Sequence, residues 1–293
     1  MTTAPHFLLL IPATLVALLA QEGSRSLSSL LGNSHEDSAE WHREVGHAYY
    51  RAGKIQPTLE HLQKAIRLDS GNEQYYLDLG EVLAQNNARD AVVVVFEAAR
   101  KALPESFRIQ SALGVAYLTI RNYEKAKQSF ADLIRVKPDY ELGYQLLAEC
   151  YDITQDWENT AKTAERLRAL NAQNSNGWYY GATAEFGIRR QNGESLEAAE
   201  AYVRRALELA PADWRPHLLL GKLLADSHRD REAVTALKKA IALKSADPKT
   251  YYILGQALKR LGLTKESAEA FKAYEGARAN HVASQRTLLV DIQ

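Results

Sequence analysis

The segment Phe107–Tyr140, FRIQSALGVAYLTIRNYEKAKQSFADLIRVKPDY, decides the fold of this chain. Small and large apolar residues recur at helical spacing in both of its halves: Leu113, Gly114 and Tyr117 in the first, and Ala126, Phe130 and Leu133 in the second. The pair Arg121-Asn122 separates the halves, and Pro138 ends the second. The segment therefore predicts two amphipathic helices that close on each other as an antiparallel hairpin.

The small residue at position 114 recurs along the chain with an interval of 34 residues at every step but one, where the interval is 39. A Gly or Ala stands at each of these places: Gly46, Gly80, Gly114, Ala148, Ala182, Gly221 and Gly255. Because a helical Gly costs about 1 kcal/mol relative to Ala, its recurrence needs a packing reason. We expect a close approach of the two helix backbones, with Gly114 against Ala126. A single hairpin cannot bury its apolar face alone, so successive hairpins must stack.

The best unit resembles the tetratricopeptide repeat (TPR), whose signature places are occupied here by Leu113-Gly114, Tyr117, Tyr123, Ala126, Phe130 and Pro138. The resemblance covers about residues 39–280 in seven units: 39–72, 73–106, 107–140, 141–174, 175–213, 214–247 and 248–280. It implies an all-α fold, a right-handed superhelical solenoid of seven TPR helix hairpins. For function it implies only the general role of binding other proteins.

Composition and the chain ends bound the function further. With 36 basic and 36 acidic residues the net charge is +0, which argues against a nucleic-acid partner. Residues 7–20 are apolar and uncharged, so we expect 1–20 to be a signal peptide, with export to the periplasm or outside the cell and no membrane span after processing. The alternatives are that residues 7–20 are retained as an anchor or form a capping helix, with the protein otherwise in the cytoplasm. Residues 21–38 read as a Ser-rich linker and 281–293 as a C-terminal tail.

No pattern of catalytic or ligand-binding chemistry stands out. The chain has no H-E-x-x-H, C-x-x-C, G-x-S-x-G or phosphate-binding Gly loop, and His42 and His47 lie five residues apart rather than four. The single cysteine, Cys150, falls at a small-residue place and should be an inert core thiol. We therefore expect no catalytic residues, no cofactor, no metal and no enzyme activity.

The surface that remains for function is the concave groove, which the first helix of each TPR unit lines. Mapping the groove face onto each unit predicts a partner-binding set: Tyr50, Leu77, Leu118, Leu142, Gln145, Tyr179, Phe186, Leu218, Lys222, Tyr252 and Lys259. Apolar members gather in the middle units, and basic ones, joined by Arg215 and Lys249, in the last two. Apolar surface rimmed by charge is typical of a peptide-binding groove. The alternative is that these side chains pack between neighbouring helices.

Two departures from the repeat qualify this interpretation. The Lys and Asn set with which some TPR grooves hold a chaperone's C-terminal carboxylate is missing, and Asp78 at one of its places would repel a carboxylate. Five extra residues of the fifth unit fall within Phe186–Ser195, either as a tolerated loop or as a partner-contacting loop. Nearby, Glu185 stands at a place that is apolar or aromatic in other units, so we expect it to pair with Arg189 or Arg190.

The sequence thus predicts a non-catalytic protein–protein interaction scaffold. It would bind an extended peptide or a partner protein in its concave groove, with aromatic anchors for affinity and groove charges for register. The alternative is a structural subunit of a cell-envelope assembly that docks through its edges or ends. Neither function involves nucleic acid.

Overall fold

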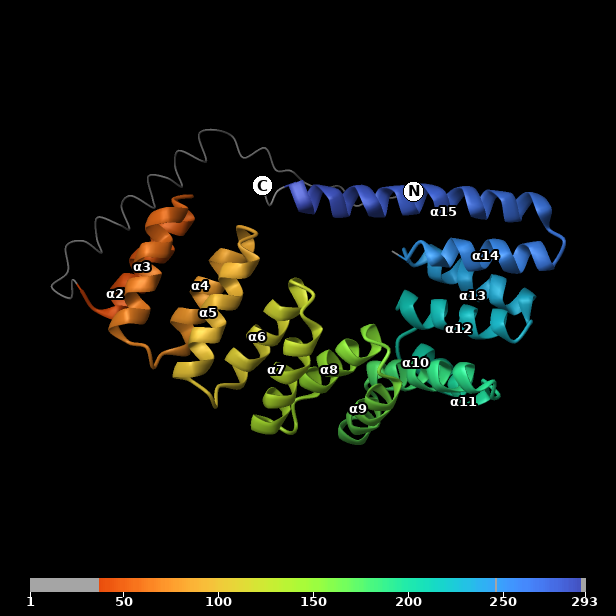
Figure 1. Ribbon diagram of the computed structural model, residues 1–293, viewed down its shortest axis with the longest axis horizontal. Coiled ribbons are helices and arrows are strands. Elements are labelled where there is room, and N and C mark those ends of the chain that lie inside the picture. Colours follow the sequence, from red (N-terminus) through yellow and green to blue (C-terminus); the bar gives the residue numbers. More distant parts are fainter. Residues whose placement is uncertain (1–36, 246, 291–293) are drawn as a thin grey trace. The chain divides into compact units, whose positions relative to one another are not determined.

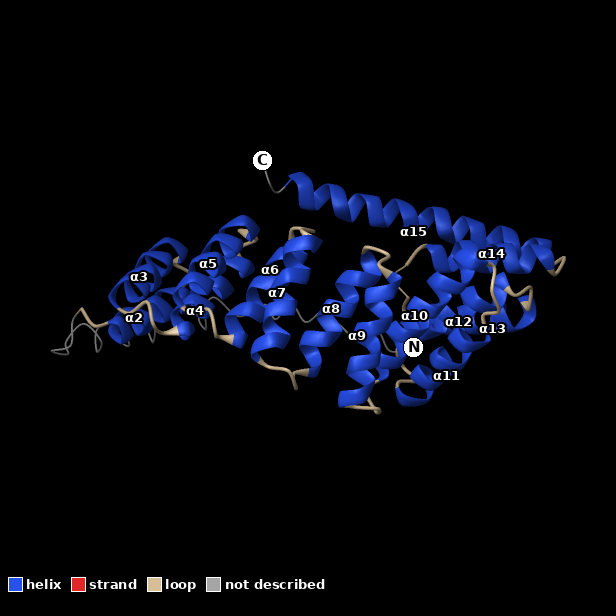
Figure 2. Ribbon diagram, turned by 60° about the horizontal axis from the view of Figure 1, so that its bottom comes forward, coloured by secondary structure: helices blue, strands red, loops and turns tan. Residues whose placement is uncertain are grey.

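The computed structural model describes residues 37–245 and 247–290, with side chains through residue 279. The predicted signal peptide and residues 21–36 of the predicted linker lie outside this range. Every regular element of the described residues is a helix (Figure 2). No helix in this part of the chain is both long and apolar enough to cross a membrane.

The chain divides into two compact units, residues 1–137 and 138–293. The first unit holds three helix hairpins (Figure 1): α2 (Ala39–Arg51) with α3 (Ile55–Leu68), α4 (Glu73–Gln85) with α5 (Arg89–Ala102), and α6 (Phe107–Thr119) with α7 (Tyr123–Val136). The second unit holds four: α8 (Glu141–Ile153) with α9 (Trp157–Leu170), α10 (Ser175–Asn192) with α11 (Glu197–Leu209), α12 (Trp214–Asp226) with α13 (Asp230–Ala242), and α14 (Lys249–Arg260) with α15 (Thr264–Val290). Within each unit, successive hairpins stack on each other. The all-α fold of seven hairpins is confirmed.

Local sequence sets where these helices begin and turn. Several first helices have a polar cap whose side chain accepts a hydrogen bond from a backbone N–H of the first turn: Ser38, Asn72, Ser106, Asn174 and Asp213. The turn into the second helix passes through a left-handed residue in most units, for example Arg121 at φ 58° and Gln155 at φ 57°. Gly53 and Gly262 occupy this place in the first and last units, where the positive φ suits a residue without Cβ.

The recurring glycine makes room for a side chain of the second helix, which corrects the backbone contact expected from the sequence. A Cβ built on Gly114 would lie 2.3 Å from the ring of Phe130, and the nearest atoms it would meet all belong to that ring, not to Ala126. The same relation holds between Gly80 and Phe96. The small residue at 114 and the large one at 130 are thus one packing feature.

The fifth unit and the C-terminus differ from the sequence-based expectation. The extra residues of the fifth unit do not form a loop. They extend α10 to Asn192, where Gly193, at φ 70°, ends the helix. At the C-terminus α15 continues through residues 281–290, which the sequence analysis assigns to a tail. Cys150 is fully buried, as predicted.

Candidate functional site

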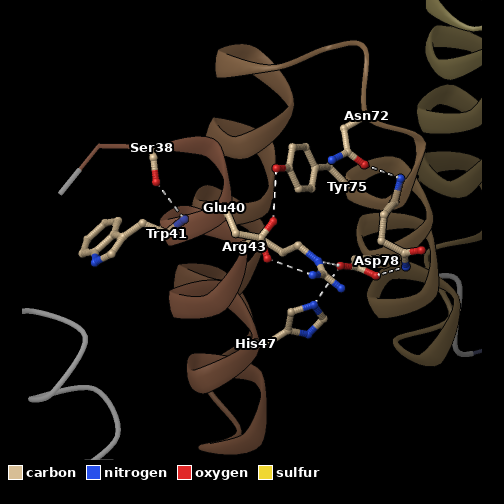
Figure 3. A network of polar contacts seen from close by, with 9 residues as sticks. Ser38, Glu40, Trp41, Arg43, His47, Asn72, Tyr75 and Asp78 are labelled. Atoms are coloured by element: carbon tan, nitrogen blue, oxygen red, sulfur yellow. Dashed lines mark hydrogen bonds and ion pairs between the residues drawn. The ribbon is translucent and has the colours of Figure 1, made fainter. Parts of the chain in front are cut away.

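In the first unit, a buried carboxylate ties the first two hairpins together (Figure 3). Asp78 on α4 is 5% exposed and accepts hydrogen bonds from Arg43 Nε at 2.6 Å, His47 Nε2 at 2.8 Å and Gln74 Nε2 at 2.6 Å. Burial alone would raise the pKa of Asp78, but the hydrogen bonds from Arg43, Gln74 and His47 outweigh it and hold this pKa below its usual value. The carboxylate is therefore ionised and fully occupied by its own chain.

This network bears on recognition of a carboxylate. Arg43 also donates to Glu40 at 3.1 Å, and Glu40 in turn accepts from the Tyr75 hydroxyl at 3.2 Å. The guanidinium of Arg43 is thus already bound by Asp78 and Glu40. A ligand carboxylate here would have to displace both, in agreement with the missing clamp set in the sequence.

The first unit also contains an apolar hollow of about 450 Å³ between α4, α5 and α6. Its walls are formed mainly by small and apolar side chains, among them Leu77, Ala84, Val92, Phe96, Ala112 and Val115. Of the three residues predicted for the groove in this unit, Leu77 lines the hollow. Leu118 does not, and the Tyr50 hydroxyl donates to Gln85 Oε1.

The second unit contains a larger groove, of about 700 Å³. We call it the second-unit groove and define it by the residues that line it: Gln155, Trp157, Phe186, Gly187, Arg190, Gln191, Lys222, Ala225, Asp226, Lys249, Tyr252, Ile253, Gln256 and Arg260. They come from the α8–α9 turn and from helices α9, α10, α12 and α14. Aromatic side chains, amides and cations therefore share one hollow.

The groove wall is strongly basic although the chain is neutral. Four cations face one carboxylate there, since Arg190, Lys222, Lys249 and Arg260 are lining residues and Asp226 is the acidic one. Two of the cations are held in ion pairs. Arg190 Nε lies 3.0 Å from Asp226 Oδ2, and Arg260 lies 2.5 Å from Asp230.

Among the described residues, neither Lys222 nor Lys249 has an ion pair within 4 Å. Lys222 is the half-buried one of the two. Burial lowers the pKa of Lys222 most, and the repulsion of Lys249 and Arg190 adds to this, against the opposing attraction of Asp247 and Asp152. The Lys222 amine has therefore lost part of its water without gaining an ion pair among the described residues.

Asp152, at the end of α8, carries the opposite imbalance. Burial raises its pKa, a hydrogen bond with Thr183 and the charge of Lys222 lower it in part, and Glu149 raises it further. The Thr183 hydroxyl donates to the carbonyl oxygen of Tyr180 at 3.0 Å. Within the described chain, Asp152 has no ion pair. Desolvated ionisable groups without an ion pair, near a groove, are typical of functional sites.

The structure brings together only part of the set predicted for the second unit. Phe186, Lys222 and Tyr252 line the second-unit groove, and Tyr252 is 41% exposed. Leu142 and Lys259 are exposed but lie outside its wall, and Gln145 accepts a hydrogen bond from Asn176 at 3.0 Å.

Leu218 is a wrong prediction, because it is 5% exposed and belongs to the core cluster between α10, α12 and α14. The positive charge of Arg215, expected to face the groove, is already bound within the chain. Its guanidinium lies 2.6 Å from Asp213 and donates to Asn176 at 3.0 Å. It covers the ring of Tyr179, at 5.1 Å from the centroid, and Tyr179 itself packs against the core. These residues join neighbouring hairpins, as the alternative interpretation of the sequence anticipated.

Sequence reasoning missed the contribution of α9 and of the extended α10. Trp157 at the start of α9 packs against Gly187, where an added Cβ would lie 2.4 Å from the indole. The sequence contained one sign of this contact, because Gly187 is a glycine within a helix that does not belong to the 34-residue repeat of small residues. The extension also places Arg190 and Gln191 in the groove wall, while Arg189 pairs with Glu185 at 2.6 Å, one of the two pairings expected.

Among the described residues, no His, Cys, Asp and Glu side chains form a group of three or more that could hold a metal ion. Sequence reasoning missed a histidine pair across α2 and α3, where the Nδ1 atoms of His42 and His61 are 2.8 Å apart.

Comparison with known proteins places this chain in a family. The model of the ETO1 C-terminal domain matches residues 2–267. The chain belongs to the ETO1 C-terminal domain family. It is also similar in structure to a tetratricopeptide repeat protein from Parabacteroides merdae, with a TM-score of 0.64 and 16% identity over 87% of this chain and 99% of that one. That likeness shows the fold, and the resemblance to the TPR family is confirmed.

Two curated relatives of this ETO1-type chain have names that state a role. It is 21% identical to the Lipopolysaccharide assembly protein B of Escherichia coli, over 78% of this chain and 59% of that protein. It is 27% identical to the peroxisomal targeting signal receptor of Candida albicans, over 71% of this chain and 36% of that protein. The chain thus spans less than two thirds of the length of either relative.

Proposed function

We propose that this protein is a non-catalytic interaction scaffold whose second-unit groove binds an extended segment of a protein partner. The observation that carries the proposal is the composition of this groove. Exposed Tyr252 and half-buried Trp157 and Phe186 offer apolar contact, beside a Lys222 that lacks an ion pair. Aromatic side chains supply most of the affinity of such interfaces, and charges supply register and speed of association.

The amides of the groove suit an extended backbone. Gln155, Gln191 and Gln256 lie along the wall, and each can donate to a carbonyl and accept from an N–H. An extended peptide carries unpaired backbone groups of both kinds, so amide side chains can satisfy them without requiring a particular sequence. TPR proteins in general bind other proteins and are not catalysts, and one relative is by name a receptor for a targeting signal.

Export is part of the same proposal. It rests on the apolar, uncharged run at residues 7–20. The mass of the intact protein from its native host tests it, because cleavage near Gln21 shortens the chain. A full-length product in the cytoplasm would contradict export and leave the groove proposal untouched.

A selection from a random peptide library displayed on phage tests the groove. The protein is immobilised, and the enriched peptides are then synthesised and measured by titration calorimetry. Tyr252→Ala should weaken their binding at least about tenfold, because truncation of a central anchor costs about 2 kcal/mol or more. Leu263→Ala is the matched control, since Leu263 is equally exposed, at 42%, but is not part of the groove wall.

Three results are possible. Loss of binding in Tyr252→Ala but not in Leu263→Ala supports the proposal. Enriched peptides that bind both variants normally would place the interaction elsewhere and favour a subunit that docks through its edges or ends. A library that yields no binder at all would contradict peptide recognition.

A further inference from the structure

We infer that the second-unit groove selects acidic segments, with a ligand carboxylate seated at Lys222 beside an apolar or aromatic ligand side chain. This inference rests on the proposed function and names the chemistry of the partner. It commits to an acidic peptide rather than to any other polyanion. Three observations support it, and each concerns a different property of the groove.

The first observation is the charge of the wall. Lys222, Lys249, Arg190 and Arg260 line the wall, and the pairs of Arg190 with Asp226 and of Arg260 with Asp230 leave two lysines as an excess of positive charge in a chain with a net charge of +0. Such an excess confined to one hollow attracts an acidic partner over the range of a Debye length, about 8–10 Å at physiological salt. It repels a basic segment by the same amount.

The second observation is the position of Lys222 itself. Arg190 and Arg260 are already held by Asp226 and Asp230, so a ligand gains little from either. Lys222 is half-buried and has no ion pair, although Asp152 and Asp247 lie near enough to act on it electrostatically. A carboxylate brought to this amine pairs a charge that has lost part of its water, and such hydrogen bonds are stronger than those at an exposed site.

The third observation is what surrounds this lysine in the groove wall. Phe186 on the extended α10, Trp157 on α9 and Tyr252 with Ile253 on α14 line the same hollow. The guanidinium of Arg190 lies 5.8 Å from the centroid of the Phe186 ring, and that ring also packs against the core of the unit. An acidic residue next to an apolar one therefore finds both of its contacts in a single hollow.

The peptides selected from the phage library test this inference. Each enriched peptide is made in two forms, as selected and with every Asp and Glu replaced by Asn and Gln, and both forms are measured against the full chain by fluorescence anisotropy. We expect enrichment of acidic peptides and a loss of affinity of at least about tenfold on neutralisation, because the charge-assisted hydrogen bond to Lys222 is lost. Lys222→Gln should cause the same loss for the acidic form and little change for the amide form. Lys239→Gln is the matched control, an exposed lysine on α13 outside the groove wall.

The outcomes separate this inference from the proposed function. Enriched peptides that are neutral or basic, yet lose binding in Tyr252→Ala, would overturn acid selection and leave peptide binding in place. Acidic peptides that bind Lys222→Gln as well as the parent would overturn the role of Lys222. The same assay with a labelled single-stranded oligonucleotide guards against a general polyanion site, and competition with the peptide at equal affinity would overturn the commitment to a peptide. The absence of any groove-dependent binder would sink the proposed function itself.

Discussion

Each unit has a carboxyl group on the first helix of a hairpin, Asp78 on α4 and Asp152 on α8, and the two differ in their surroundings. In the first unit Asp78 is surrounded by Arg43, His47 and Gln74, and its pKa is lowered. In the second unit Asp152 has no ion pair among the described residues, and burial raises its pKa. The first arrangement stabilises the fold, whereas the second leaves a desolvated carboxyl group without an ion pair. The carboxylate of the first unit is thus neutralised by its own chain, whereas the second unit keeps charged groups that a ligand can still pair with.

The hollows of the two units differ in the same sense. The first-unit hollow is lined mainly by small apolar side chains. The second-unit groove has aromatic side chains, three glutamines and two lysines without ion pairs. A wall of this second kind offers contacts to both the backbone and the side chains of a ligand. The contrast is the reason to place partner binding in the second unit.

The largest expected effect concerns what the two units share, the packing of a recurring glycine. Gly114→Leu in the first unit should lower the free energy of unfolding by about 3 kcal/mol, because the new side chain overlaps the ring of Phe130. Gly221→Leu in the second unit should cost less. The atoms it meets belong to Leu237, whose side chain is more flexible than an aromatic ring. Urea denaturation followed by circular dichroism measures both variants.

Gly276→Ala on α15 is the control for this comparison. A Cβ added there meets nothing within 4 Å, so the change should be neutral or stabilise by up to about 1 kcal/mol, the helix propensity of Ala over Gly. If Gly114→Leu unfolds at the same urea concentration as the parent, the packing argument for the repeat is wrong.

The glycine example also shows how far the sequence could predict the fold. The interval of the small residues predicted the number of the hairpins, because a small residue is needed wherever a large side chain of the second helix packs against the first. It could not identify the partner of Gly114, since Ala126 and Phe130 lie one turn apart on the same face of α7. Only the structure shows that the side chain of Phe130, and not that of Ala126, reaches Gly114.

The binding surface was less predictable for a physical reason. Mapping one groove face onto every unit assumes that all neighbouring hairpins stack alike. Leu218 shows where this fails, since α12 buries it in the core, and Trp157 shows the converse, since a second helix enters the groove wall. Phe186, Lys222 and Tyr252 were found because their places follow the regular register. Arg190 and Gln191 follow it only after the extension of α10 is known.

The next expected effect comes from removing the charge of Asp78, the hydrogen-bonded carboxylate of the first unit. Asp78→Asn should destabilise the first unit by about 2 kcal/mol at neutral pH, because Arg43 and His47 lose their shared acceptor. The folded-state pKa is lowered, so the contribution of Asp78 is complete above the ordinary value of 3.8 and disappears only as the pH falls through the lowered value. Thermal melts from neutral to strongly acidic pH should therefore show a gap between parent and variant that closes only below about pH 3.8. A gap that closes near neutral pH would assign the effect to another group.

The smallest expected effect has the opposite sign and concerns Asp152, the carboxyl group of the second unit that has no ion pair among the described residues. Asp152→Asn should raise the melting temperature at neutral pH, by less than Asp78→Asn lowers it. Because the folded-state pKa of Asp152 is raised, its ionised form is disfavoured by the fold, and the amide removes that charge while keeping an oxygen for Thr183. The gain should be complete above the raised pKa and vanish as the pH falls below 3.8, where the carboxyl is neutral in both the folded and the unfolded chain.

The same melts provide the measurement. Binding of an acidic peptide by the variant should be at least as tight as by the parent, since a negative charge near Lys222 has been removed. A variant that is less stable than the parent at neutral pH would mean that the charge of Asp152 is stabilised in the folded protein, and the contrast between the two units would fail at its central point.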